Sequence, residues 1–321
     1  MTVSFIHKFT ANLVILGHRW DRRQRPLIAP TASKDFIMGL LGILILSAAV
    51  GILLLVPLII AREGYPAFFE GSGLWGLLLA DNWEPLASPA KFGLRHALLG
   101  TVTVTAVALL AAAPVGFGIG IFLAEVAPAP VRKILQPCLE LLAGIPSVVY
   151  GFFGYVTLVP WFEQNFDMST GESSLAAGLI LAVMILPFVA TTSAEAFRAV
   201  PADLKEAALA LGVNRWSLVR QIVVRYAGAG MFAAMALGLA RALGETLAVL
   251  MLAGNSVALP TSLLDRGQPV TALIVTELGE AAAGSPKYHA LFLAALILMV
   301  VTTAINTLIG VLKKRIIYDA A

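Results

Sequence analysis

Two charged side chains stand inside an otherwise apolar stretch. Arg241 and Glu245 fall within Ala227–Ala253, and Arg241 is its fifteenth residue. An Arg at the middle of a membrane helix costs at least about 2.5–3.5 kcal/mol on insertion scales, so it is expected to face a cavity or a partner. At i and i+4 the two side chains would share a helix face and could form an ion pair. The chemistry leaves two interpretations open: a pair that only fixes helix packing, or a guanidinium that offers its planar fork of donors to an anion such as phosphate.

A second polar feature is an interrupted apolar stretch, Ile134–Phe162. Gly144 and Pro146 break its helical pattern, and the freed backbone groups must be satisfied inside protein or in a water-filled cavity. Interrupted helices at the middle of a membrane often mark a substrate path. Hydroxyl groups stand beside both features and are further candidates for that path: Ser147, Tyr150 and Thr246.

The connection Glu195–Tyr226 is patterned rather than random. Pro201 suits the first turn of a helix, Gly212 a helix C-cap and Asn214 the N-cap of a second helix. Between them an apolar stripe recurs at i, i+3, i+4 and i+7: Leu204, Ala207, Ala208 and Leu211. We expect two short helices that form a rigid projection, with a small Ala face suited to a groove on another protein.

The elements that position these residues must lie in a lipid bilayer. Of the 321 residues, 59% are hydrophobic and 13% are charged, and the mean hydropathy is +0.88. Soluble domains carry roughly 25% charged residues. A single cysteine, Cys138, excludes a disulfide scaffold, and a net charge of +3 is too small to argue for nucleic acid.

Six stretches are long and apolar enough to span about 30 Å of hydrocarbon. They predict an all-α, polytopic membrane protein with six transmembrane helices: Phe36–Ala61, Ala97–Leu123, Ile134–Phe162, Leu175–Ala194, Ala227–Ala253 and Ala290–Leu312. In the second stretch Gly116, Gly118 and Gly120 would let another helix approach closely. The run Pro269–Gly279 is too short to cross and is interpreted as a re-entrant or surface helix.

Basic residues predict the orientation. Of the 22 Lys and Arg, 16 fall on the side that holds both termini, which the positive-inside rule assigns to the cytoplasm. We therefore expect three parts: an N-terminal cytoplasmic segment 1–35 with a possible amphipathic interfacial helix, a transmembrane domain 36–312 with a cytoplasmic loop at 195–226, and a cytoplasmic tail 313–321.

Enzymatic chemistry is poorly supported. The sequence has no phosphate-binding GxxxxGK[ST] loop, no cluster of metal-ligand spacing and no nucleophile set at membrane depth. We expect a transport subunit without its own ATP site, cofactor or metal.

The motifs carry a resemblance. Glu206-Ala207-Ala208, followed by Gly212, resembles the EAA loop of ABC-importer permeases, although Val224-Arg225 stands where that family usually has Leu-Pro. The string Arg241-Ala242-Leu243-Gly244-Glu245-Thr246 resembles the permeases of phosphate ABC importers, as does the string from Ala143 to Gly151, and both are closer to the PstC type than to the PstA type.

The resemblance implies an ABC type I importer permease in the cell inner membrane, a heterodimer with a PstA-type permease. Two ATPase subunits would drive it through the Glu206–Gly212 loop, and an external phosphate-binding protein would deliver phosphate. Arg241 and Glu245 would be the essential charges. The alternatives are a gradient-driven secondary transporter or channel for an oxyanion, and an ABC permease for another oxyanion such as sulfate or molybdate.

Overall fold

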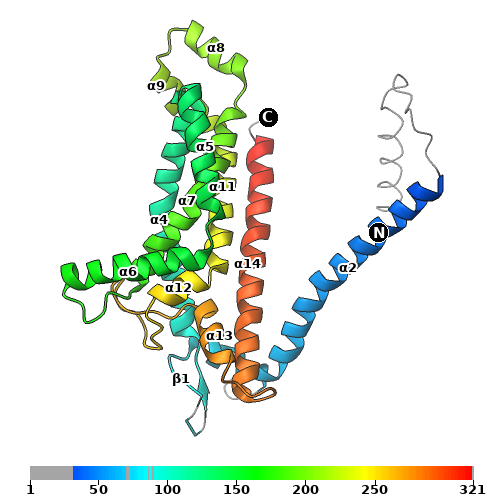
Figure 1. The fold of residues 1–321 in the computed structure, drawn as a ribbon, viewed down its shortest axis with the longest axis vertical. Helices are drawn as coiled ribbons and strands as arrows, with labels where there is room; N and C mark the ends of the chain where they lie inside the picture. Colours follow the sequence, from blue (N-terminus) through cyan, green and yellow to red (C-terminus); the bar gives the residue numbers. More distant parts are fainter. Residues whose placement is uncertain (1–31, 70–72, 86, 89, 320–321) are drawn as a thin grey trace. The chain divides into compact units, whose positions relative to one another are not determined.

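The long apolar stretches are helices in the computed structural model, which describes residues 32–69, 73–85, 87–88 and 90–319 (Figure 1). Among these residues four helices are long and apolar enough to cross a membrane. They are α2 (Ala32–Gly64), α4 (Arg95–Ile121) with the π-helical turn η2 (Phe122–Val126), α7 (Ser174–Arg198) and α14 (Pro286–Asp319). The amphipathic helix expected near the N-terminus lies outside the described residues, and α14 continues through most of the expected tail.

The third and fifth expected spans are broken helices. The third consists of α5 (Ala129–Gly144) and α6 (Ser147–Phe166), whose axes are bent by 90°. The fifth, expected as continuous over Ala227–Ala253, consists of α11 (Gly228–Gly244) and α12 (Leu247–Leu252). A further bend of 67° separates α11 from the segment Arg215–Tyr226 before it. With the pair α5 and α6, and the pair of Arg215–Tyr226 and α11, each counted as one span, the described residues hold up to six spans, which agrees with the predicted number. The third span is interrupted where the sequence predicted, whereas the fifth, expected to be continuous, is broken.

The chain divides into two compact units, Met1–Val56 and Pro57–Ala321. In the first unit the described residues belong to α2. In the second, α4 packs along α7, and α5, α6 and α11 also contact α7. A Cβ atom added at Gly116 or Gly120 would lie 2.8 Å from Val189 or Ser193 of α7, whereas one added at Gly118 would meet nothing within 4 Å. Two of the three expected close approaches are therefore present, because small residues let the helix backbones meet.

Each end of the second unit carries its own small elements (Figure 1). The upper end in the view holds α8 (Ala202–Ala210), α9 (Arg215–Ser217), η3 (Leu218–Val223) and α10 (Val224–Tyr226). The lower end holds η1 (Tyr65–Phe68), α3 (Gly73–Leu79), α13 (Val270–Leu278) and the antiparallel strands β1 (Trp83–Glu84) and β2 (Lys91–Phe92). The expected short helix at Pro269–Gly279 is thus α13, which packs against α4, α12 and α14.

Candidate functional site

The break between α11 and α12 is held by a side chain from another helix. α11 ends at Gly244, and the backbone of Glu245 is extended, with φ −72° and ψ 134°. The hydroxyl of Thr271, in α13, donates a hydrogen bond to the carbonyl oxygen of Glu245 over 2.9 Å. A carbonyl that the interrupted helix leaves without a partner is thereby satisfied, as buried backbone groups require.

Arg241 lies in the last turn of α11, where the helix dipole favours a cation. Its guanidinium carbon is 4.4 Å from the centre of the Phe188 ring of α7, a cation–π contact. The side chain is exposed, and none of the ion pairs among the described residues includes it. The planar fork of donors is therefore presented to the space beside the break.

The expected ion pair between Arg241 and Glu245 is wrong in this structure. The helix ends at Gly244, so Glu245 does not share a helical face with Arg241. Instead, the half-buried Glu245 carboxylate accepts a hydrogen bond from the backbone N–H of Ala248 over 3.4 Å, at the start of α12. Thr246, the other candidate beside the break, is half-buried, and its hydroxyl donates to the carbonyl of Gly244 over 3.4 Å.

The break between α5 and α6 falls at the expected residues. α5 ends at Gly144, the backbones of Ile145 and Pro146 are extended, and α6 begins at Ser147. The buried Tyr150 hydroxyl donates to the carbonyl of Leu142 over 2.8 Å, so it ties the two arms together across the bend. Its proton is therefore engaged by the backbone, whereas the half-buried Ser147 stands at the start of α6.

The two broken helices meet. Figure 1 shows α6 and α12 lying across the direction of α7 and α11, and α12 packs against α6. A Cβ atom added at Gly151 of α6 would lie 2.9 Å from the Cα atom of Ala248 of α12. Both interruptions thus belong to one region of the protein, with Arg241 beside it.

The patterned connection forms the expected projection. Gly212 ends its first helix with φ +82°, a left-handed conformation that glycine adopts without a Cβ penalty, and Asn214 Oδ1 accepts from the N–H of Ser217 over 2.8 Å. Of the expected stripe only Ala208 is buried, while Leu211 is 86% exposed. Glu206 and Ala207 are exposed as well. Most of the apolar side chains of the stripe therefore remain available to another surface.

An ion pair that the sequence did not reveal anchors this projection. Lys205 Nζ of α8 lies 2.5 Å from Glu125 Oε1 of η2, and the two side chains are only 21% and 12% exposed. The partners are 80 residues apart in the chain. No local pattern could have paired them, although Lys205 directly precedes the expected Glu206 motif.

The chain is similar to known transport proteins. A family model for binding-protein-dependent transport system inner membrane components matches residues 116–318. The chain is 41% identical over 238 residues to the probable ABC transporter permease protein YqgH of Bacillus subtilis (strain 168), covering 74% of this chain and 77% of that relative. It is 38% identical over 257 residues to the phosphate transport system permease protein PstC of Xylella fastidiosa (strain 9a5c), covering 74% of this chain and 78% of that relative.

A solved structure has the same fold. A chain in the crystal structure of a bacterial alginate ABC transporter, in complex with alginate pentasaccharide-bound periplasmic protein, matches with a TM-score of 0.61 at 17% identity. The match covers 89% of this chain and 98% of that chain. The two chains therefore share one overall fold.

Proposed function

Because this chain belongs to the family of binding-protein-dependent transport system inner membrane components, we propose that it is the permease subunit of an ATP-driven importer of inorganic phosphate. The observation that carries the proposal is the similarity to PstC phosphate permeases, which reaches 38% identity and extends over about three quarters of the chain. A chance motif would not produce similarity of that extent.

Arg241 is the anion-recognising group in this proposal. A phosphate dianion in a membrane pathway needs charge compensation, and a guanidinium matches its oxygens in a bidentate way. The exposed guanidinium beside two broken helices supports this role. Ser147 and Thr246 contribute hydroxyl donors, Tyr150 and Glu245 hold the two breaks in shape, and a second permease of PstA type supplies the opposite wall.

The projection at α8 transmits the closure of the ATPase subunits to the membrane helices. Two separate ATPase subunits receive its exposed side chains from Glu206 to Gly212, and their closure moves this segment and reopens the pathway on the opposite side. This chain supplies no ATP site, so hydrolysis belongs to the assembled complex. The partly buried pair of Lys205 and Glu125 supports such coupling, because it connects α8 directly to the end of α4.

We also propose an orientation in the inner membrane. The end with α8 and α9 faces the cytoplasm together with both chain termini, as the excess of Lys and Arg on that side supports. The end with β1, β2 and α13 faces outward, where a phosphate-binding protein delivers the substrate.

Uptake of labelled phosphate tests the proposal. Phosphate-starved cells that lack this chain would be compared with the same cells after its restoration. We expect restored uptake that is abolished by ATP depletion and is not competed by excess sulfate. Uptake that survives ATP depletion but collapses with the ion gradient would instead establish a secondary transporter, and competition by sulfate or molybdate would establish a different oxyanion specificity.

A further inference from the structure

A small cavity lies behind the break between α11 and α12, and residues of α4, α11, α12 and α13 line it. Its volume is about 10 Å³, so a phosphate ion does not fit. Arg241 is not among the lining residues. The polar lining consists of two threonines of α4, the acid of the break and a threonine of α13: Thr101, Thr105, Glu245 and Thr271.

Two of the three hydroxyl groups are already held by hydrogen bonds. Thr101 Oγ1 donates to the carbonyl of Ala97 over 2.8 Å and accepts from the N–H of Val270 over 3.0 Å, which joins α4 to the start of α13. Thr271 Oγ1 donates its proton to the carbonyl of Glu245 over 2.9 Å. It can therefore only accept a further hydrogen bond.

Thr105 and the carboxylate of Glu245 have unused hydrogen-bonding capacity. Thr105 is 5% exposed, and no hydrogen bond among the described residues involves its hydroxyl. Glu245 Oε1 accepts one long bond, 3.4 Å from the N–H of Ala248, and Oε2 has no partner in the described part of the chain. A buried hydroxyl without a partner costs free energy. Both side chains line the same cavity without a direct hydrogen bond, so a bridging molecule would satisfy both.

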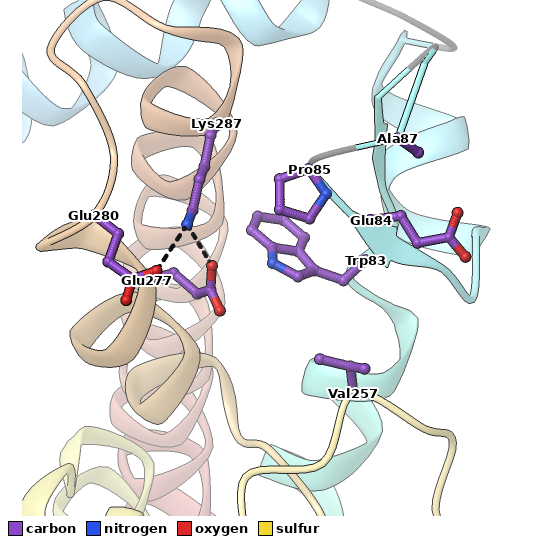
Figure 2. Close-up of a pocket in the computed structure, with 8 residues that line it drawn as sticks. All are labelled: Trp83, Glu84, Pro85, Ala87, Val257, Glu277, Glu280 and Lys287. Carbon is purple, nitrogen blue, oxygen red and sulfur yellow. Dashed lines mark ion pairs between the residues drawn. The ribbon is translucent and has the colours of Figure 1, made fainter.

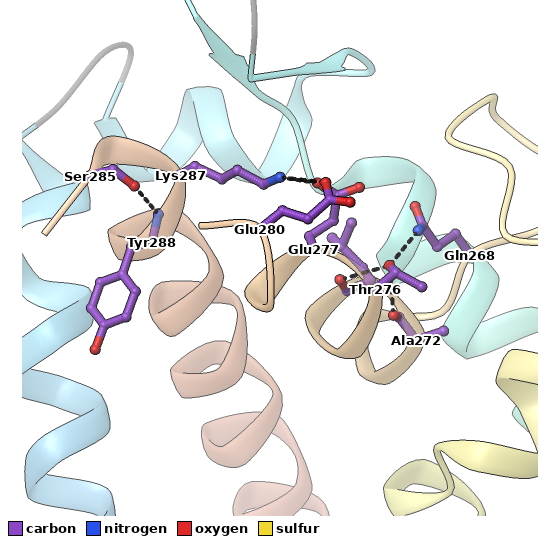
Figure 3. Close-up of polar contacts among 9 residues, drawn as sticks. Gln268, Ala272, Thr276, Glu277, Glu280, Ser285, Lys287 and Tyr288 are labelled. Carbon is purple, nitrogen blue, oxygen red and sulfur yellow. Dashed lines mark hydrogen bonds and ion pairs between the residues drawn. The ribbon is translucent and has the colours of Figure 1, made fainter. Parts of the chain in front are cut away.

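The wall that α13 contributes is anchored by contacts outside the cavity. Glu277, near the end of α13, pairs with Lys287 Nζ of α14 over 2.6 Å, and the two side chains are 22% and 16% exposed (Figure 2). The buried Gln268, just before α13, donates through Nε2 to Thr276 Oγ1 over 3.2 Å (Figure 3). These contacts hold α13 in place, so Thr271 presents its acceptor at a defined position.

We propose that the cavity holds one water molecule that bridges Thr105 to the carboxylate of Glu245. The water accepts from the Thr105 hydroxyl and donates its two protons to the Glu245 carboxylate and to Thr271 Oγ1. A water molecule needs a cavity of about 10–15 Å³ and about two to four polar partners. The cavity volume and these three partners agree with both requirements.

Thr105 is thereby a positioning residue that acts through Glu245. The water joins the Glu245 carboxylate to α4 and α13, which stabilises the break and keeps Arg241 in place at the last turn of α11. The water site follows from the geometry of the break, whereas its effect on transport rests on the proposed function.

A high-resolution cryo-EM map of the complete complex in lipid nanodiscs tests the site. We expect a density peak within hydrogen-bond distance of Thr105 Oγ1, Thr271 Oγ1 and a carboxylate oxygen of Glu245. In a map that resolves other ordered waters and keeps Thr271 on the Glu245 carbonyl, absence of that peak would overturn the inference. A peak whose oxygen neighbours lie at metal-coordination distances would identify a cation and would overturn it as well.

Replacing Thr105 tests the positioning role. Thr105→Val removes the hydroxyl with little change in shape. We expect the peak to disappear and phosphate uptake per assembled complex to fall about three- to tenfold, as for the loss of one hydrogen bond. Thr105→Ser keeps the hydroxyl, and we expect it to retain the peak and most of the uptake, which a purely steric role of Thr105 would not produce.

Thr103→Val is the matched control. It makes the same change two residues away on α4, at a half-buried side chain that does not line the cavity. We expect the peak and the uptake of the wild type. Normal uptake by Thr105→Val would overturn the positioning role. A wild-type complex that shows the water but does not take up phosphate would instead count against the proposed function.

Discussion

At the scale of single residues, Arg241 has an unusual environment. It lies beside the helix break without a carboxylate partner among the described residues, and a Phe188 ring contacts its guanidinium from one side. A cation over an aromatic face gains about 0.5–2 kcal/mol without consuming its in-plane hydrogen-bond donors. The residue is thus held in place while its donors remain available.

Replacing Arg241 tests whether its guanidinium N–H donors bind phosphate. Arg241→Gln removes the charge, and loss of a charged hydrogen bond costs about 1.5–3 kcal/mol, so we expect phosphate uptake to fall about 10- to 100-fold. Arg241→Lys keeps the charge but not the bidentate geometry, and we expect an intermediate loss. The measurement is labelled phosphate uptake, normalised to the amount of assembled complex.

Arg62→Gln controls for the loss of one positive charge. The Arg62 side chain is 83% exposed and lies 3.9 Å from Glu63, so its removal should leave uptake unchanged. Normal uptake by a fully assembled Arg241→Gln complex would rule out the role given to Arg241.

The sequence identified the charged residues of this region but did not predict how they interact. A charged residue inside an apolar run identifies Arg241 and Glu245 on composition alone. Their expected ion pair depended on a continuous helix, and the helix stops at Gly244. The hydroxyl that satisfies this break belongs to Thr271, 26 residues further along the chain, so no local pattern predicts it.

At the scale of elements, the close packing of α4 on α7 depends on glycine. Gly120→Val would bring a Cβ atom to within 2.8 Å of Ser193 Cβ, and both atoms sit close to their helix backbones. Overpacking of this kind lowers the free energy of unfolding by about 1–3 kcal/mol. We expect a lower thermal unfolding temperature for the assembled complex in detergent.

Gly118→Val is the internal comparison for that prediction. It makes the same chemical change two residues away on the same helix, where an added Cβ meets nothing within 4 Å. The unfolding temperature should stay near that of the wild type. Equal effects of the two variants would show that helix propensity, rather than contact with α7, determines the result.

Element boundaries show what periodicity can and cannot predict. Gly144 and Pro146 correctly indicated where the third span is interrupted, because proline lacks the N–H that a helix interior needs and glycine has a low helix propensity. The 90° turn that follows is a property of packing, since α6 lies against α12 and α7. The direction of α6 after the bend depends on contacts with helices that are distant in the chain, and an apolar stretch of sequence does not reveal those contacts.

At the scale of the whole molecule, an ion pair connects the projection at α8 to the turn that follows α4. Lys205→Met would leave Glu125 without its cation in a site where it is only 12% exposed. Breaking an ion pair that is this deeply buried destabilises the folded protein by about 1–3 kcal/mol. We expect α8 to lose its fixed position and phosphate uptake to fall about tenfold in a complex that still assembles.

A charge-swap variant tests whether the ion pair itself, rather than either residue alone, supports uptake. The double variant Lys205→Glu/Glu125→Lys should recover a large part of the uptake that each single replacement loses. Lys133→Met, at an exposed lysine that joins none of the ion pairs among the described residues, should have no effect. If Lys205→Met transported normally, the pair would have no part in coupling.

The single thiol of the chain gives the molecule a built-in attachment point. Cys138 is exposed on α5, six residues before the helix ends at Gly144. A maleimide dye or a spin label can therefore be attached beside the bend without first removing other thiols from this subunit. The mobility and solvent exposure of the label beside the bend can then be followed by spectroscopy during turnover, in a subunit that otherwise keeps its natural sequence.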